Sequence, residues 1–288
     1  MANILITGGA GNLGTALSQK LLQEGHRLRV FDLPQADFCL HEARGIEIIK
    51  GNLLDFDALR LAVIGMDVIF HLAAILPPAS EKDRERTLQV NVQGTENLLR
   101  ARQELSFEPR LIFSSSVSVY GDTSKETPPV GVDHPLQASD NYSESKIRCE
   151  ESLQKQTINY TILRISGISI PAFMDPPEVW QFQPGQRVEM IAIGDLVTAL
   201  VKAMGKSESR GKIFNIAGGK GWQMYGKDFV TAFCRALDLS LAIQKFQRHP
   251  GWFDWYDTAE SQKILGYQET SFEDFEKQLR KAVQEAMA

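Results

Sequence analysis

The stretch NILITGGAGNLG, residues 3–14, decides the fold because it joins a strand to a helix through a glycine-rich turn. The apolar run 3–7 predicts a short strand, and leucines recur at helical spacing over 13–25. The turn contains Gly8, Gly11 and Gly14. In such a turn the first glycine permits the bend, the second admits a pyrophosphate and the third allows close packing of the helix on the strand. The stretch therefore predicts a dinucleotide-binding unit.

A carboxylate at the end of the second predicted strand, 26–32, completes this pattern. Asp32 follows the turn by about 20 residues, where a carboxylate accepts hydrogen bonds from the adenosine ribose. It would repel the 2′-phosphate of NADP, and the next residues are Leu33 and Pro34 rather than arginine. The sequence thus favours NAD over NADP.

Strand-like and helix-like segments alternate through the first two-thirds of the chain. The further predicted strands are 45–52, 67–74, 110–116 and 159–166. The further predicted helices are 83–104 and 141–156. Because short connections join them, we expect an α/β fold, a doubly wound parallel sheet of the Rossmann type with helices on both faces.

The alternation ends after Ser166. Segment 167–190 contains four prolines and three aromatic residues, so we expect a loop there. The elements predicted beyond it are a helix at 194–204, a strand at 212–218, a helix near 225–237 and a C-terminal helix at 271–288. The predicted organisation is a core of residues 1–166 rejoined by about 191–217, and a small C-terminal substrate-binding lobe with a closing helix, formed by 167–190 and 219–288.

Composition excludes several classes of function. The 288 residues are 43% hydrophobic and 23% charged, and the net charge of −5 argues against a nucleic-acid partner. The three cysteines lack the spacing of a metal site. The N-terminus runs directly into a strand without a signal peptide, and no apolar run approaches the length of a membrane span. We expect a cytoplasmic protein with a small-molecule substrate, no metal and no membrane partner.

The stretch YSESK, 142–146, is the strongest candidate for chemistry. Tyr142 and Lys146 are spaced to share one helix face. An ammonium beside the phenol, together with a positive nicotinamide ring, would lower the pKa of Tyr142, which could then exchange a proton with a substrate hydroxyl. Ser116 ends the predicted strand 110–116, at the edge where open α/β sheets bind ligands. Taken alone, the Tyr–Lys pair is more often a solvated helix face.

These motifs, in this order, resemble those of the extended short-chain dehydrogenase/reductases, the NAD-dependent epimerase/dehydratase family. The matching segments are TGGAGNLG (7–14), GNLLD (51–55), HLAA (71–74), NVQGTENLL (91–99), SSSVSVYG (114–121), YSESK (142–146) and LR (163–164). The resemblance implies a catalytic triad of Ser116, Tyr142 and Lys146. In it the tyrosine is the acid and base, the lysine also holds the nicotinamide ribose, and the serine orients the reacting oxygen.

The same resemblance implies a set of cofactor contacts beyond the glycines, Asp32 and the triad. It places Asn12 and Leu13 at the pyrophosphate, and Asn52 and Leu53 at the adenine. It implies that Leu72, Ala73 and Ala74 line the cofactor with Asn91 nearby, although Asn91 could equally be an ordinary helix residue. It also implies a homodimer formed by the helices that hold Asn91 and Tyr142.

The neighbours of Ser116 bear on the reaction. Dehydratases of the family carry an Asp–Glu pair directly after the triad's hydroxyl residue, and decarboxylating relatives carry a glutamate at the second position. This chain has Val117 and Ser118, so we expect hydride transfer, either net or out and back.

The substrate lobe departs from that of the family's sugar-nucleotide enzymes. Arg187 is the sole basic residue from Ile165 to Val201, and a diphosphate requires more positive charge than this. Gly167 and Ala192 replace an asparagine and a histidine common in those enzymes. The expected substrate is smaller or more apolar, screened by Phe173, Trp180, Phe182 and the nearby Trp252 and Trp255 unless these aromatics simply form core.

The leading hypothesis is therefore an NAD-dependent oxidoreductase that interconverts a secondary alcohol and a carbonyl. The first alternative is a nucleotide-sugar 4-epimerase with tightly bound NAD. The second is a cofactor-sensing regulator, which the intact triad disfavours.

Overall fold

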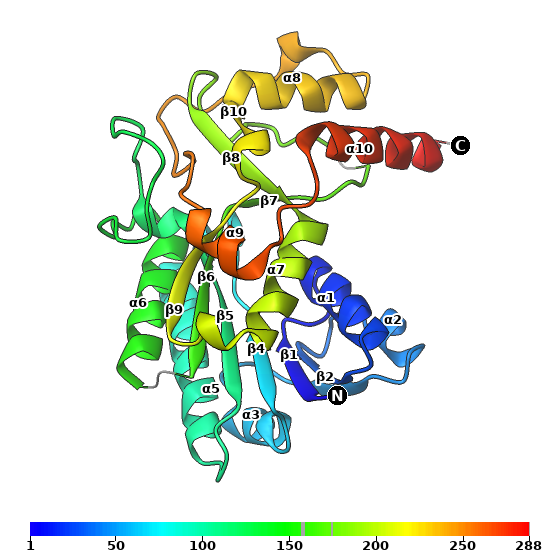
Figure 1. The fold of residues 1–288 in the computed structure, drawn as a ribbon, viewed down its shortest axis with the longest axis vertical. Coiled ribbons are helices and arrows are strands. Elements are labelled where there is room, and N and C mark those ends of the chain that lie inside the picture. The colour runs from blue at the N-terminus through cyan, green and yellow to red at the C-terminus, as the bar shows by residue number, and fades with distance from the viewer. Residues whose placement is uncertain (157–158, 174, 288) are drawn as a thin grey trace. The chain divides into compact units, whose positions relative to one another are not determined.

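A seven-stranded sheet forms the framework of the computed structural model, which describes residues 1–156, 159–173 and 175–287. The strand order is β3-β2-β1-β4-β5-β6-β9 (Figure 1). The bounds are Asn3–Thr7 (β1), Arg27–Asp32 (β2), Glu47–Lys50 (β3), Val68–His71 (β4), Arg110–Ser116 (β5), Tyr160–Ile165 (β6) and Lys212–Ile216 (β9). The order reverses direction between β1 and β4, so the expected doubly wound parallel sheet is confirmed.

Register aligns the carboxyl ends of the central strands. Thr7 of β1 pairs with His71 of β4, and His71 pairs with Phe113 of β5, all in parallel. The residues that follow each strand therefore emerge at one edge of the sheet. Gly8 and Leu72 leave the sheet at this edge, and the last residues of β5 extend beyond it to Ser116.

The helices of this framework match most sequence expectations. Their bounds are Asn12–Gln23 (α1), Cys39–Glu42 (α2), Phe56–Val63 (α3), Arg84–Leu88 (α4), Gly94–Gln103 (α5) and Asn141–Gln156 (α6). Helix α1 packs beside β1 and β2 (Figure 1), while α3, α5 and α6 contribute to a hydrophobic core with Leu5, Ile69 and Leu111. The single helix expected over 83–104 is interrupted by a π-helical turn, η2 (Gln89–Gln93), where the side chain of Asn91 turns inward to polar partners.

The chain divides into two compact units. Unit 1 comprises Met1–Ser116, Asp140–Arg164 and Leu200–Phe214, and unit 2 comprises Val117–Ser139, Ile165–Ala199 and Asn215–Ala288. These bounds differ from the expected ranges chiefly because 117–139 belongs to unit 2. The reason is backbone pairing, since Val130 donates to the carbonyl of Trp255 at 2.8 Å and accepts from the amide of Asp257 at 2.9 Å.

Unit 2 contains a three-stranded sheet in the order β10-β8-β7. The bounds are Gly167–Ser169 (β7), Arg187–Ala192 (β8) and Gln223–Tyr225 (β10). The expectation of a loop over all of 167–190 was therefore wrong at both ends. Strand β7 ends before Pro171 and β8 begins after Pro184, so the prolines interrupt only the segment between them. Met174, within that segment, lies outside the described residues.

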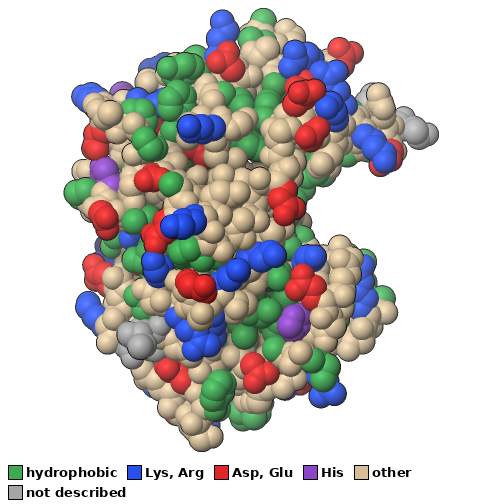
Figure 2. All heavy atoms as spheres, viewed as in Figure 1, with side chains coloured by type: hydrophobic (Ala, Val, Ile, Leu, Met, Phe, Trp, Pro, Cys, Tyr) green, Lys and Arg blue, Asp and Glu red, His purple; other side chains and the backbone are tan. Residues whose placement is uncertain are grey.

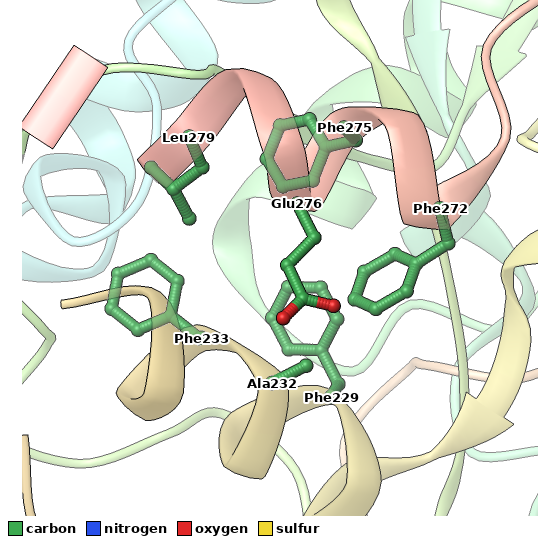
Figure 3. Close-up of a pocket in the computed structure, with 7 residues that line it drawn as sticks. All are labelled: Phe229, Ala232, Phe233, Phe272, Phe275, Glu276 and Leu279. Carbon is green, nitrogen blue, oxygen red and sulfur yellow. The ribbon is translucent and has the colours of Figure 1, made fainter. Parts of the chain in front are cut away.

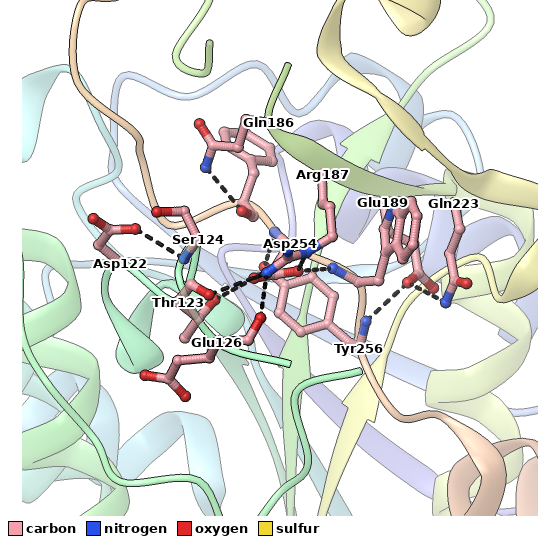
Figure 4. Close-up of polar contacts among 12 residues, drawn as sticks. Asp122, Thr123, Ser124, Glu126, Gln186, Arg187, Glu189, Gln223, Asp254 and Tyr256 are labelled. Carbon is pink, nitrogen blue, oxygen red and sulfur yellow. Dashed lines mark hydrogen bonds and ion pairs between the residues drawn. The ribbon is translucent and has the colours of Figure 1, made fainter. Parts of the chain in front are cut away.

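A buried polar network holds the irregular segments of unit 2 together. The carboxylate of Asp254 accepts from Arg187, with Nη2 to Oδ2 at 2.8 Å, and from the hydroxyl of Thr123 at 2.6 Å (Figure 4). The same guanidinium donates to the carbonyls of Thr123 and Glu126 at 3.1 and 3.0 Å. Nearby, the buried carboxylate of Glu189 accepts from the amide of Tyr256 at 2.9 Å. Charged groups thus connect the loops to β8.

Aromatic side chains form the core of unit 2. The remaining helices are α7 (Ile193–Gly205), α8 (Gly226–Ala236), α9 (Ala259–Leu265) and α10 (Phe272–Met287), and the expected last helical residue, Ala288, lies outside the described residues. Trp180 and Phe182 are buried and pack against Phe229 of α8. They are core residues, which is one of the two alternatives that the sequence left open, whereas Phe173 is 51% exposed. Figure 3 shows side chains of α8 and α10 lining a small groove.

The surface is mixed in charge. On the face shown in Figure 2, Lys and Arg side chains are interspersed with Asp and Glu. Within the described ranges, none of the helices is both long and apolar enough to span a membrane.

Candidate active site

The glycine-rich turn between β1 and α1 leaves little room for side chains at two of its three predicted glycines. Gly8 has φ +70°, and a Cβ there would lie 2.7 Å from the amide nitrogen of Ala73. A Cβ on Gly14 would lie 2.5 Å from the carbonyl oxygen of Gly8. At Gly11, in contrast, a Cβ would come no closer than 3.5 Å to the described protein atoms. Protein packing therefore explains the first and third glycines but not the second.

The first turn of α1 suits an anion. Among the described residues no side chain caps this helix at Gly11, and the first turn carries no acidic residue. Asn12 is exposed and Leu13 half-buried, so both remain accessible beside this turn. The helix dipole and the first backbone amides would both favour negative charge here.

Asp32 lies beside this turn at the end of β2. Its Oδ2 accepts from the amide of Ala10 at 2.9 Å, and its Oδ1 accepts from the amide of Leu33 at 2.8 Å. These two bonds orient the carboxylate, and each oxygen retains a lone pair for a ribose hydroxyl. The turn and Asp32 together fit the adenosine and pyrophosphate of a dinucleotide.

Two further segments predicted to line the cofactor are held in place by short contacts. Asn52 accepts from the amide of Leu54 at 3.1 Å, and Leu53 is so close to Gly94 that a Cβ there would lie 2.6 Å from the Cβ of Leu53. The segment Leu72–Ala74 follows β4, and the amide of Leu72 donates to the carbonyl of Thr7 at 3.1 Å. It therefore passes directly beside the glycine-rich turn.

His71 is a buried residue of this edge to which the sequence analysis assigned no role. Its Nδ1 lies 2.6 Å from the hydroxyl of Thr7, and its Nε2 lies 2.9 Å from the hydroxyl of Thr95. Burial lowers the pKa of His71 to about 3, so the imidazole is neutral. It links β4 to β1 and α5. The signal was present in HLAA, because a histidine inside an apolar strand requires polar partners.

Asn91 joins the segment after β4 to helix α6. Its Oδ1 accepts from the amide of Ile75 at 2.7 Å, while its Nδ2 donates to the carbonyl of Ile75 at 3.1 Å and to the hydroxyl of Ser145 at 3.0 Å. The residue is 2% exposed. It is therefore a buried connector beside the YSESK segment rather than an ordinary helix residue.

The Tyr–Lys pair lies in the first turns of α6, beside the end of β5. The ammonium of Lys146 donates to the carbonyl of Ser114 at 2.7 Å and lies 5.5 Å from the centre of the Tyr142 ring. Lys146 is buried, so the pair is not a solvated helix face. Ser116 is the buried last residue of β5. All three predicted triad residues thus belong to unit 1, on the two elements that Lys146 connects.

Burial dominates the electrostatics of the pair. It lowers the pKa of Lys146 to about 8, because the ammonium has exchanged water for protein. It also raises the pKa of the Tyr142 phenol, with smaller contributions from Asp140 and Cys149. In the protein without cofactor, the pKa of Tyr142 is therefore raised and not lowered as expected, since the effect of burial exceeds that of one ammonium near the ring. The phenol is protonated at neutral pH and can act as an acid.

The residues after Ser116 supply no second acid or base. Val117 and Ser118 form the start of η3 (Val117–Tyr120), and both are fully buried. The groups beside the end of β5 therefore include the phenol of Tyr142, the ammonium of Lys146 and the hydroxyl of Ser116.

A glycine-rich turn, a carboxylate at the end of β2, and a buried lysine with a half-buried tyrosine beside β5 define a dinucleotide-binding protein of the doubly wound class. The sequence profile of the NAD dependent epimerase/dehydratase family matches residues 4–172. The chain belongs to this family.

Curated relatives include both sugar-acid and steroid enzymes. The chain is 34% identical to D-erythronate dehydrogenase of Cupriavidus necator over 187 residues, which are 58% of this chain and 56% of that protein. It is 40% identical to a 3 beta-hydroxysteroid dehydrogenase/Delta 5-->4-isomerase of Mycobacterium tuberculosis over 124 residues, 41% of this chain and 33% of that protein. The matches thus span about a third to just over half of these relatives.

Solved structures share the fold over the whole chain. UDP-glucose 4-epimerase of Thermotoga maritima, solved with UDP-glucose, has a TM-score of 0.85 at 20% identity, covering 99% of this chain and 100% of that one. A short-chain dehydrogenase/reductase superfamily protein of Agrobacterium tumefaciens, solved with bound NAD, has a TM-score of 0.80 at 23% identity, covering 99% and 98%.

Proposed function

We propose that the protein is an NAD-dependent oxidoreductase that interconverts a secondary alcohol and a carbonyl on a small molecule. The observation that carries this proposal is the position of Lys146, whose ammonium bonds to the end of β5 at 2.7 Å and lies 5.5 Å from the Tyr142 ring. Family membership supports the cofactor class, and the absence of a carboxylate at Val117 and Ser118 supports hydride transfer over elimination.

Each member of the proposed triad has a distinct task. Bound NAD supplies the acceptor or donor of the hydride. Tyr142 donates its proton to the carbonyl oxygen in the reducing direction and takes it back in the oxidising direction. The ammonium of Lys146 stabilises the phenolate that forms, and binds the nicotinamide ribose. The hydroxyl of Ser116 donates to the same substrate oxygen and orients it.

NAD rather than NADP is the proposed cofactor. The carboxylate of Asp32 is oriented by the amides of Ala10 and Leu33, so it is available to ribose hydroxyls and repels a 2′-phosphate. Calorimetric titration with each cofactor tests this preference, for which we expect the dissociation constant of NADP to be at least tenfold higher.

A substrate without a diphosphate is favoured by the state of Arg187. Its guanidinium is already bound by Asp254 and by two backbone carbonyls. The sole basic residue of 165–201 therefore brings no uncompensated charge to a phosphate group. The names of the two dehydrogenase relatives, which act on an erythronate and on a hydroxysteroid, are consistent with a small or apolar alcohol.

The second candidate is a nucleotide-sugar 4-epimerase with tightly bound NAD. Fold similarity to UDP-glucose 4-epimerase favours it, because hydride transfer out and back needs the same triad. Net formation of NADH distinguishes the two candidates, since an epimerase regenerates its NAD in every turnover.

The test is an assay of the protein with NAD and three probes, namely D-erythronate, a 3β-hydroxysteroid and UDP-glucose. We expect NADH to accumulate with one of the two alcohols and UDP-glucose to be unchanged. Tyr142→Phe should lower turnover by about 10²- to 10⁴-fold while the dissociation constant of NAD stays constant. Full activity of that variant would contradict the mechanism, and epimerisation of UDP-glucose without NADH would favour the second candidate.

The proposed setting is a cytoplasmic homodimer formed through the helices that carry Asn91 and Tyr142. Sedimentation at micromolar concentration should then show a dimer. A monomer under those conditions would exclude this assembly.

A further inference from the structure

Helix α6, which carries Tyr142 and Lys146, has an N-terminus closed by groups from two parts of the chain. Asp140 supplies the local cap, because its Oδ1 accepts from the amide of Ser143 at 2.7 Å and its carbonyl accepts from the amide of Glu144 at 3.1 Å. A single side chain cannot satisfy every amide of a first turn. The amides of Asn141 and Tyr142 therefore need acceptors from elsewhere.

Glu81 supplies both acceptors from a distant segment. It belongs to η1 (Ala79–Lys82), and its Oε2 accepts from the amide of Asn141 at 3.0 Å while its Oε1 accepts from the amide of Tyr142 at 3.2 Å. Glu81 is 60 residues from Asn141 in sequence. A carboxylate that spans two amides at a helix N-terminus also has a favourable interaction with the helix dipole.

A second contact joins the same two segments. The side-chain amide of Asn141 donates to the carbonyl of Ser80 at 3.1 Å, and Ser80 is fully buried. The hydroxyl of Ser80 donates to Oε1 of Glu81 at 2.8 Å, which orients the carboxylate. Segment η1 and the first turn of α6 are therefore locked together at the residue that bears the proposed acid.

We propose that Glu81 is a positioning residue for Tyr142, an inference that rests on the proposed function of that tyrosine. Glu81 accepts a hydrogen bond from the backbone amide of Tyr142. It therefore fixes the position of the Tyr142 Cα, and so of the phenol, relative to Lys146 and the end of β5. Loss of the carboxylate leaves two amides of the first turn unpaired, and the turn frays. Because proton transfer requires atoms within hydrogen-bond reach, a displacement of about 1 Å costs about 100-fold in rate.

Asp83 provides a matched control two residues further along the chain. Its Oδ1 accepts from the amide of Arg86 at 2.9 Å, and it caps α4 in the same way that a carboxylate caps α6. Helix α4 carries none of the proposed triad. Asp83→Ala thus removes one exposed helix-capping carboxylate that accepts from neither Asn141 nor Tyr142, and the pairing of the adjacent Arg84 with Glu144 of α6 does not involve it.

The first measurement is independent of the substrate. In protein labelled on its tyrosine rings, the signal of Tyr142 is assigned by its loss in Tyr142→Phe. We expect Glu81→Ala to shift or broaden that signal, and the amides of Asn141 and Tyr142 to exchange with solvent at least tenfold faster. Asp83→Ala should leave both observables unchanged. An unaltered ring signal and unaltered exchange in Glu81→Ala would overturn the proposal.

The second measurement uses whichever of the three probes is turned over. Glu81→Ala should lower kcat about tenfold to 100-fold with KM and the dissociation constant of NAD unchanged. Glu81→Gln retains one acceptor oxygen and should recover part of kcat, and it replaces the alanine variant if that variant does not fold. If Tyr142→Phe abolishes turnover while Glu81→Ala keeps full kcat, the positioning role is wrong and the proposed function stands. If Tyr142→Phe is fully active, the proposed function is wrong, and the ring signal alone then decides whether Glu81 holds the residue.

Discussion

Each of the two units pairs an arginine with a fully buried carboxylate, but they use the pair differently. In unit 1, Nη2 of Arg164 on β6 lies 2.7 Å from Oε2 of Glu150 on α6. In unit 2, Nη2 of Arg187 on β8 lies 2.8 Å from Oδ2 of Asp254, which belongs to an irregular segment. The first pair joins a helix to a strand, whereas the second joins loops to a strand.

The difference follows from what else holds each unit together. Unit 1 has helices packed on a parallel sheet, so its ion pair adds orientation to a framework that hydrophobic contacts already define. Ser115 of β5 also donates to Glu150, which places α6 against the strand that ends at Ser116. In unit 2, Arg187 donates to two loop carbonyls as well as to its carboxylate partner. The ion pair therefore positions a helix in unit 1, whereas in unit 2 it holds loops in place.

The largest expected effect comes from breaking the pair of unit 1. Glu150→Ala leaves the guanidinium of Arg164 buried, at 3% exposure, without its carboxylate. We expect the free energy of unfolding to fall by about 3–5 kcal/mol, as measured by urea denaturation. Glu144→Ala removes a half-buried partner of the exposed Arg84 and Arg148 and should cost less than about 1 kcal/mol. Equal decreases in the free energy of unfolding of the two variants would contradict the expectation that burial makes the Glu150–Arg164 pair matter more for stability.

The next largest expected effect is on the pH dependence of stability, and it concerns Glu189 in unit 2. Burial raises the pKa of Glu189 to about 7, so the folded protein binds this proton more tightly than the unfolded chain does. The proton on Glu189 therefore adds to the free energy of unfolding. This contribution is fully present below the ordinary pKa of a glutamate and is lost as pH rises towards 7. The loss is at most about 3 kcal/mol.

Glu189→Gln does not titrate and tests this directly. Urea denaturation at pH 5 and at pH 8 should show a smaller decline in stability for the variant than for the unaltered protein. The exposed Glu273→Gln serves as the control and should retain the full decline. A decline of equal size in the Glu189 variant would contradict the assignment.

A smaller loss is expected on neutralising the carboxylate of the unit 2 pair. In Asp254→Asn, Arg187 keeps its two carbonyl acceptors and some solvent, because its side chain is 18% exposed. We expect a loss of about 2 kcal/mol, less than that for Glu150→Ala. Cleavage of segment 123–130 by a protease should accelerate as well. A loss that exceeds that of Glu150→Ala would reverse the comparison between the two units.

The smallest expected effect is on the affinity for NAD, and it tests whether the buried ammonium of Lys146 in unit 1 binds the cofactor. Burial lowers the pKa of Lys146 to about 8, so its ammonium is lost as pH rises through that value. If the ammonium binds the ribose of NAD, the dissociation constant should increase about tenfold above pH 8, which is about 1.4 kcal/mol. Calorimetry over pH 6–9 measures it. Lys146→Met should bind NAD weakly at every pH, and the same pH dependence in that variant would contradict the role.

Sequence patterns predicted the parallel sheet and the edge of it that carries the candidate site. The glycines, Asp32 and the Tyr–Lys pair were accessible because each follows a local rule of spacing or of strand ends. Strand β7 was not, and the sequence could not decide between a core and a substrate-facing position for Trp180 and Phe182, since short strands and aromatic loops look alike in sequence. The raised pKa of Tyr142 in the protein without cofactor was not accessible either, because burial has no local signature.

The sequence by itself determined the seven strands of the main sheet and the turns that follow them, because hydrophobic periodicity and turn chemistry act over a few neighbouring residues. The tertiary structure alone decided the partners of the charged groups. Glu81 reaches the amide of Tyr142 across 61 residues, and Arg187 reaches Asp254 across 67. From sequence alone, a carboxylate could be solvated by water, cap a helix or form an ion pair. Only the packed fold, by excluding water and bringing distant donors together, selects one of them.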